Sequence, residues 1–194
     1  MITDWHNVSI SKYKELKQLG EDYSDSSIDS NVEATVRAIS ILNNDSEDNV
    51  WNYTMGKLNE LTKQLSFLRS FPEIKKKKYK KLKIGELELE ADVNMKEFTV
   101  AQHLDFQSVW SEEEKDLARL IAVFYIPKGR KYNDGYDVVQ LIQDIEESID
   151  IVTANEISFF LCRKLLKSTL FTRIFLSLLA KRTSKKIQKL MKNQ

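Results

Sequence analysis

The residues best suited to acid–base or metal chemistry in this chain are two histidines and a single cysteine. His6 and His103 lie far apart, and neither stands in a CxxC or HExxH spacing that would indicate a metal site. Cys162 follows Phe159 and Phe160, and this apolar neighbourhood favours a buried, unreactive thiol. We therefore expect neither a metal site nor nucleophilic catalysis at these three positions.

The glycines and carboxylates form no catalytic pattern either. The five glycines match neither GxGxxG nor GxxxxGK[ST], the spacings of phosphate-binding loops. Consecutive acids occur at 112–114 and 146–147, where they suit a helix start and a solvated helix face better than a general acid and base. The sequence therefore predicts a non-enzymatic protein that needs no cofactor.

The clearest functional signal is the distribution of charge. The formal net charge is +1, yet residues 84–160 carry seventeen acids and six bases, and residues 161–194 carry ten bases and no acid. Segregation of this kind bears on binding partners rather than on the fold. It predicts an interaction protein with a basic C-terminal segment.

A second basic segment is the sequence KKKKYKKLK at residues 75–83, which contains seven lysines. Three interpretations are open: a solvated connector or strand edge, where lysine discourages edge-to-edge pairing; an electrostatic patch for nucleic acid or an acidic protein surface; and a nuclear signal. The residues that we assign to the basic patch are Lys75, Lys76, Lys77, Lys78, Lys80 and Lys81, together with Lys185, Lys186 and Lys189 near the C-terminus.

Residues 154–190 are predicted to form a long helix that is apolar over most of its circumference. Such a helix lies inside a fold or docks on another molecule. Beyond Ala180, one apolar stripe runs beside lysines, which suits a partner groove, an anionic membrane surface or nucleic acid. The alternative to docking is that the basic residues beyond Ala180 only complement the dipole of the helix at its C-terminal end, where the helix frays. We favour docking on protein through Phe160, Phe171, Ile174, Phe175, Leu178, Ile187 and Leu190.

A membrane span is not expected in this apolar segment. Its longest uncharged stretch, residues 174–180, has seven residues, whereas roughly twenty are needed to cross a bilayer.

Helical periodicity and turn residues predict a mostly helical α+β fold with one small antiparallel β-hairpin. Apolar and charged residues alternate on both sides of Gly85-Glu86, which indicates a two-stranded hairpin at about 80–93. A hairpin is marginally stable alone, so it must pack on the helices or on a partner. We expect residues 1–150 to form a helical domain with this hairpin inserted, and residues 151–194 to form the long basic helix, packed on that domain or on a partner.

The helix boundaries follow from capping residues and breakers. A short helix after residues 9–11 is expected to end at Gly20, and others are expected at 31–42, 47–70 and 136–149. Ser46 or Asp48 can cap the helix at 47–70, and Thr99 can cap one that begins with Val100. Residues 111–114 read as a capping box that starts a helix extending to about 125.

Residues 3–19 (TDWHNVSISKYKELKQL) follow the pattern W-x-x-[IV]-[ST]-[IV]-x-x-[YF]-x-x-L. This pattern resembles the opening of a family of small morphogenesis proteins of tailed bacteriophages, notably crAss-like phages of Bacteroidetes. Residues 82–110 resemble its second block, a hairpin followed by [IL]-T-[VA]-x-Q-[FYH]-[IL]-D. In this chain the second part of that block is Phe98, Thr99, Val100, Gln102, His103, Leu104 and Asp105, with Phe98 where the pattern has Ile or Leu.

The resemblance implies a role in assembly, as in tail assembly chaperones or baseplate assembly proteins, with no catalytic residue to carry over. The implied partners are tail, portal or connector proteins and further copies of this chain. The implied location is the host cytoplasm during assembly, or the virion. The lysine run and the basic terminal helix depart from the family pattern. They leave open a virion component that contacts packaged DNA, or a nucleic-acid-binding protein that uses residues 75–83 and 161–194.

Overall fold

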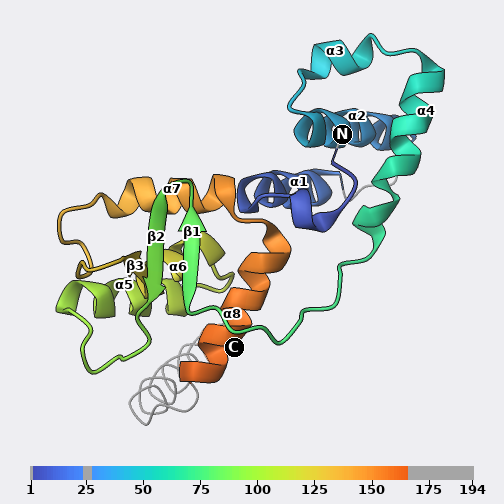
Figure 1. Cartoon of the computed structure of the whole chain (residues 1–194). Coiled ribbons are helices and arrows are strands. Elements are labelled where there is room, and N and C mark those ends of the chain that lie inside the picture. Colours follow the sequence, from blue (N-terminus) through green and yellow to red (C-terminus); the bar gives the residue numbers. More distant parts are fainter. Residues whose placement is uncertain (1, 24–27, 166–194) are drawn as a thin grey trace, which may run out of the picture. The chain divides into compact units, whose positions relative to one another are not determined.

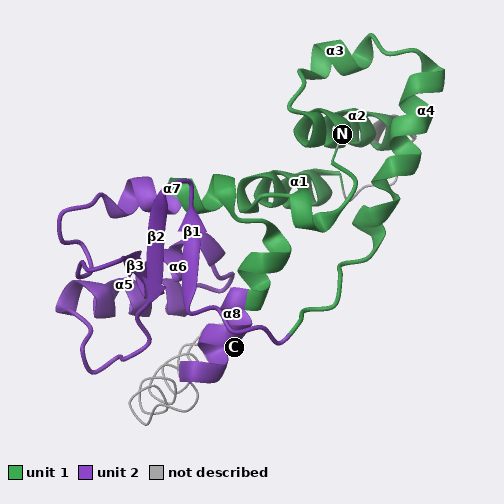
Figure 2. Ribbon diagram, viewed as in Figure 1, with its two compact units in different colours: residues 1–75, 143–156 green, residues 76–142, 157–194 purple. Residues whose placement is uncertain are grey.

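The computed structural model describes residues 2–23 and 28–165, with the backbone alone for 28–30. In this part of the chain, eight α-helices and a small antiparallel sheet make a mostly helical α+β fold, which confirms the predicted class (Figure 1). The chain divides into two compact units (Figure 2). Unit 1 contains residues 1–75 and 143–156, and unit 2 contains residues 76–142 and those from 157 onward.

Unit 1 is built from helices whose starts are set by capping side chains. The hydroxyl of Ser9 accepts a hydrogen bond from the N–H of Lys12, and Ser46 and Thr54 cap two further helices in the same way. The cap at Ser46 agrees with one of the two residues predicted for it. Helix α1 begins at Ile10, earlier than the predicted start after residue 11, and it continues two residues past Gly20. The elements are η1 (Trp5–Asn7), α1 (Ile10–Asp22), α2 (Ile28–Asn43), α3 (Glu47–Trp51), α4 (Met55–Gln64) and η2 (Leu65–Arg69).

The prediction of a single helix at 47–70 is wrong, because the chain breaks at residues 52–54 between α3 and α4. Tyr53 turns toward the interior and donates its hydroxyl to Asp45 Oδ2 at 2.6 Å. Thr54 then caps a new helix. This break lets both short helices pack on α2, around a buried cluster of Val36, Ile39 and Val50 with Tyr53, Leu58, Leu61 and Leu65 beside it.

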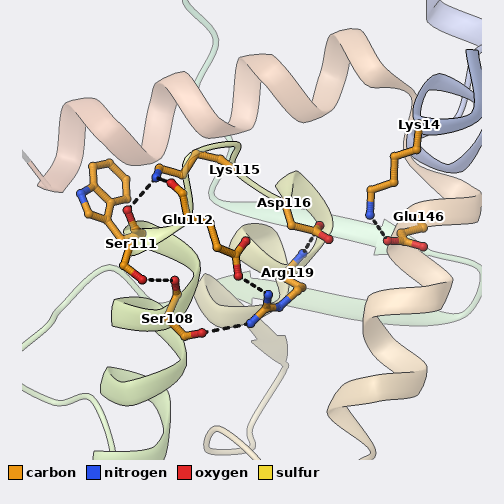
Figure 3. A network of polar contacts seen from close by, with 9 residues as sticks. Lys14, Ser108, Ser111, Glu112, Lys115, Asp116, Arg119 and Glu146 are labelled. Carbon is orange, nitrogen blue, oxygen red and sulfur yellow. Dashed lines mark hydrogen bonds and ion pairs between the residues drawn. The ribbon is translucent and has the colours of Figure 1, made fainter. Parts of the chain in front are cut away.

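Segments far apart in the sequence meet at the start of α1. The N–H of Ile10 donates to the carbonyl of Ile149 at 3.0 Å. On the next turn, Lys14 forms an ion pair with Glu146 (Figure 3). These contacts explain why residues 143–156 belong to unit 1.

Unit 2 contains a three-stranded antiparallel sheet in the order β1 (Lys81–Ile84), β2 (Leu87–Ala91), β3 (Tyr125–Pro127). The predicted hairpin is present, and Gly85 forms its turn with a φ of 55°, a value that glycine adopts without strain. The third strand is absent from the prediction. It has three residues and ends in a proline, so its pattern is too short to indicate a strand.

The prediction of a helix that starts at a 111–114 capping box is also wrong. Ser111 is the last residue of α5 (Val100–Ser111), and α6 (Leu117–Phe124) begins after Asp116, whose carboxylate accepts from the N–H of Arg119 at 3.1 Å. Arg119 also pairs with Glu112, and the ammonium of Lys115 donates to the carbonyls of Trp110 and Glu112 (Figure 3). The charged residues therefore build a corner between two helices.

Helix α6 lies at the centre of unit 2. Almost every one of its residues is buried, and it continues directly into β3. An apolar helix of this kind must be covered on all sides, and α5 packs against it. The position of α6 therefore fixes both the third strand and the orientation of α5.

Two helices complete the described chain: α7 (Val138–Ser148) and α8 (Ile151–Leu165). Each runs from one unit into the other. The long helix predicted at 154–190 is described as far as Leu165, and its remainder lies outside the described residues. In the described part of the chain, no helix is long and apolar enough to cross a membrane.

Candidate protein-interaction surfaces

Helix α5 is held in place at its N-terminus. Thr99 accepts a hydrogen bond from the N–H of Gln102 at 3.1 Å, which confirms it as the N-cap. Just before it, the ring of Phe98 packs against Phe124 of α6, with 5.5 Å between the centroids. These two residues fix where the helix starts and the direction in which it leaves the sheet.

One face of α5 points into unit 2. Gln102, Phe106 and Val109, spaced by four and three positions, are all buried. The ring of Phe106 packs edge-on against Phe124 at 5.4 Å, and the amide of Gln102 donates to the carbonyl of Val123 at 2.9 Å. The buried amide thus bonds a carbonyl near the end of α6, where a carbonyl has no partner within its own helix.

The other face of α5 carries apolar residues that the described part of unit 2 does not cover. Val100 and Leu104, one helical turn apart, are 78% and 58% exposed. The same face continues with Ser108 and Ser111, which are also exposed. These two residues are not among the contact residues predicted from the sequence. The pattern places Val100 and Leu104 on a different stripe from Phe106 and Val109, but it does not show which stripe is buried.

A pocket of about 330 Å³ lies on another side of α5, lined by Asp105, Val109, Arg119, Tyr132 and residues of α7. Its polar groups bond to the protein itself. The hydroxyl of Tyr132 donates to Asp105 Oδ2 at 2.8 Å, and Asp137 caps α7 by accepting from the N–H of Val139 at 2.8 Å. Arg119 is likewise paired with Glu112. Because these polar groups already bond to one another or to the backbone, we assign them a structural role.

The raised pKa values of two tyrosines in unit 2 predict that the protein loses stability at alkaline pH. Burial, and then the hydrogen bond to Asp105, raise the pKa of Tyr132, and burial raises the pKa of Tyr125. Tyrosines of the unfolded chain ionise near pH 10. Stability from the neutral phenols is therefore complete below about pH 10 and falls as the pH rises toward the folded-state pKa values.

Denaturant unfolding between pH 8 and 11.5 tests this expectation. The Tyr132→Phe variant should lose about 1 kcal/mol at neutral pH, because it lacks the hydrogen bond to Asp105. It should also show a shallower alkaline decline than the parent. A free energy of unfolding that stays constant above pH 10 in the parent would contradict the assignment.

The histidines and the cysteine are not brought together. His6 is exposed in unit 1 with its Nδ1 3.7 Å from Asp150, and His103 in unit 2 lies beside the Gln107 amide at 3.0 Å. Cys162 is half-buried, and burial raises the pKa of its thiol. No group of three or more His, Cys, Asp or Glu side chains suited to a metal ion occurs within residues 2–23 and 28–165.

The lysine run is anchored through its backbone. The N–H of Lys75 donates to the buried Glu156 of unit 1 at 3.3 Å, and the carbonyl of Tyr79 accepts from the hydroxyl of Tyr125 in unit 2 at 2.7 Å. The lysine side chains of the run are exposed. Residues 75–80 form a connector, and the run ends in the edge strand β1, where Lys81 pairs with Glu90 at 3.0 Å.

Most of the predicted C-terminal contact residues fall outside the described chain. Phe160 is described, and it is only 7% exposed, so a partner could reach little of its ring; the neighbouring Phe159 is exposed. The positions outside the described residues are Phe171, Ile174, Phe175, Leu178, Ile187 and Leu190, and the lysines Lys185, Lys186 and Lys189.

Comparisons with known proteins add no further constraint. No protein-family model, no curated protein and no solved structure matches the chain.

Proposed function

We propose that this chain is a non-enzymatic assembly protein of a tailed bacteriophage that acts through protein–protein contacts in tail or head–tail assembly. The observation that carries the proposal is the outward apolar face of α5, formed by Val100 and Leu104. We call these two residues the α5 contact face. The proposed occupant is an apolar surface of another phage structural protein.

The segment that resembles phage morphogenesis proteins divides into two sets of residues. Phe98, Thr99, Gln102 and Asp105 bond or pack within unit 2, and these roles account for their residue types. The α5 contact face has no such role in the described chain, although it belongs to the same segment. A partner that covers it would account for its apolar character.

The expected contribution of the α5 contact face to binding is substantial. Complete burial of one valine or leucine side chain contributes roughly 1.5–3 kcal/mol. Aspartate at both positions would remove that gain and place two charges in an apolar contact. We therefore expect the double variant Val100→Asp/Leu104→Asp to bind its partner at least about 100-fold more weakly.

Affinity capture from infected cells tests the proposal. The parent chain should retain tail, portal or connector proteins, and the double variant should lose them. Met55→Asp is the matched control, because Met55 is an exposed apolar residue of unit 1, and it should retain the parent's partners. Circular dichroism should show the same folded content in all three chains. Equal capture by the parent and the double variant would contradict the proposal.

Nucleic-acid binding is the alternative function, supported by the exposed lysines of residues 75–83. The sheet surface beside them also carries Glu88 and Glu90, paired with Lys128 and Lys81. These carboxylates would repel phosphate. A DNA affinity that falls steeply between about 50 and 200 mM salt would support this alternative.

A further inference from the structure

Strand β1 is an edge strand of the sheet in unit 2. The N–H of Ala91 donates to the carbonyl of Lys80 at 2.9 Å, and the register pairs Lys81 with Glu90 and Lys83 with Glu88. In an antiparallel pair, residues directed at the partner strand alternate with residues directed away from it. The backbone N–H and C=O groups of Lys81 and Lys83 therefore point toward the edge of the sheet that no other strand of the described residues occupies, here called the free edge.

The opposite edge of the sheet is different. The N–H of Lys128 donates to the carbonyl of Glu88 at 3.0 Å, so the same alternation directs Pro127 away from β2. Proline has no N–H, so this three-residue edge offers no donor at that position. The β1 edge, in contrast, keeps its donors.

Strand β2 shows which side chains complement β1. The sequence Glu88-Leu89-Glu90 lies opposite Lys83-Leu82-Lys81, so each acid faces a lysine and the two leucines face each other. The Lys81–Glu90 distance is 3.0 Å, and the neighbouring lysines, Lys128 first, hold the pKa of Glu88 below its ordinary value. A strand of alternating acidic and apolar residues is therefore the natural partner of β1.

We propose that the free edge of β1 binds an extended acidic segment of a partner protein as a fourth, antiparallel strand with the pattern Glu-apolar-Glu. Its acidic residues would lie opposite Lys81 and Lys83, and its apolar residue opposite Leu82. Further acids of the segment would meet the exposed lysines at 76–80 of unit 2. This inference does not depend on the α5 contact face, which lies on another element of unit 2.

Charge decides among the three occupants of such an edge. A second copy of β1 would set lysine opposite lysine across the new pair, which is unfavourable. A nucleic acid has no peptide backbone, so it cannot extend the sheet by pairing with the N–H and C=O groups of β1. An acidic peptide strand satisfies both the exposed backbone groups and the lysines.

The test uses the full chain and a fluorescent peptide with the core Glu-Leu-Glu-Leu-Glu, measured by anisotropy at about 50 mM salt. In the proposed pairing, the acidic residues of the peptide donate their N–H groups to β1. N-methylation of the glutamates should therefore weaken binding at least about tenfold, and N-methylation of the leucines should leave it nearly unchanged. Equal binding by both methylated peptides would overturn the proposal.

A pair of protein variants tests the same backbone contact from the other side. Lys83→Ala removes a charge, and Lys83→Pro also removes the outward N–H while leaving the β1–β2 ladder bonds in place. The proline variant should bind the peptide at least about fivefold more weakly than the alanine variant. Equal affinities, or an oligothymidylate that binds the parent more tightly than the peptide does, would contradict the assignment. Unchanged thermal unfolding would show that the sheet is intact in both variants.

Discussion

Replacement of Trp5 by alanine is expected to lower the free energy of unfolding of unit 1 by about 3–5 kcal/mol. Trp5 is only 9% exposed. Its ring packs against Tyr13, Phe67 and Phe71 with centroid distances of 5.2–6.0 Å. The variant would lose the aromatic packing and leave a cavity.

The indole of Trp5 adds a polar contribution to this packing. Its N–H donates to the carbonyls of Phe67 and Ser70, both at 2.9 Å, and so ties the N-terminal segment to the end of η2. Loss of the donor leaves both carbonyls without this partner, which adds to the effect of the cavity.

Trp51 supplies a matched control for this prediction. It is the same residue type in the same unit, yet it is 54% exposed. Trp51→Ala should lower the free energy of unfolding by less than about 1 kcal/mol. Hydrogen exchange of the α1 and α2 amides would measure both variants, and equal losses would contradict the packing around Trp5.

The Phe106→Ala substitution should destabilise unit 2 by about 3–5 kcal/mol. Phe106 is fully buried, and its ring packs against Trp110 and Phe124 at 5.6 and 5.4 Å. The surrounding helices are fixed by the α5–α6 corner and by the Gln102 bond, so the cavity can collapse only in part. We expect the destabilisation to be measurable as faster hydrogen exchange of the backbone amides of α6.

Leu104→Ala is the control on the same helix. Leu104 belongs to the α5 contact face, so its truncation should change the free energy of unfolding by less than about 1 kcal/mol. Comparison of the two variants by hydrogen exchange separates the inward and outward faces of α5. A Leu104→Ala effect as large as that of Phe106→Ala would show that the outward face is covered within the chain.

Local capping and turn chemistry could be predicted from the sequence. Ser9, Ser46 and Thr99 have the residue type and position of an N-cap, and the hairpin alternation around Gly85 is regular. These features depend on neighbours within a few positions. They can therefore be predicted from the sequence without knowledge of the tertiary contacts.

Two errors passed over local signals of the same kind. Thr54 and Asp116 are N-caps, so the starts of α4 and α6 could have been predicted from residue types within a few positions. Strand β3, in contrast, depends on a tertiary contact, because it exists only where β2 offers it an edge. Such a feature follows from packing partners that periodicity alone does not identify.

Composition identifies the lysine run, and its place before and in β1 matches one of its three interpretations, a connector and strand edge. The α5 contact face could not be predicted from the sequence, because apolar residues lie on two different stripes of this helix. Only the buried positions of Phe106 and Val109 show which stripe remains outside.

The proposed contact between the α5 contact face and another phage structural protein is tested most directly by site-specific photo-crosslinking in infected cells. A benzoylphenylalanine at position 104 should form a covalent adduct with a tail, portal or connector protein, identified by mass spectrometry. The same probe at position 55, an exposed site in unit 1, should not form that adduct. Absence of any phage-protein adduct at position 104, or the same adduct at both positions, would contradict the claim.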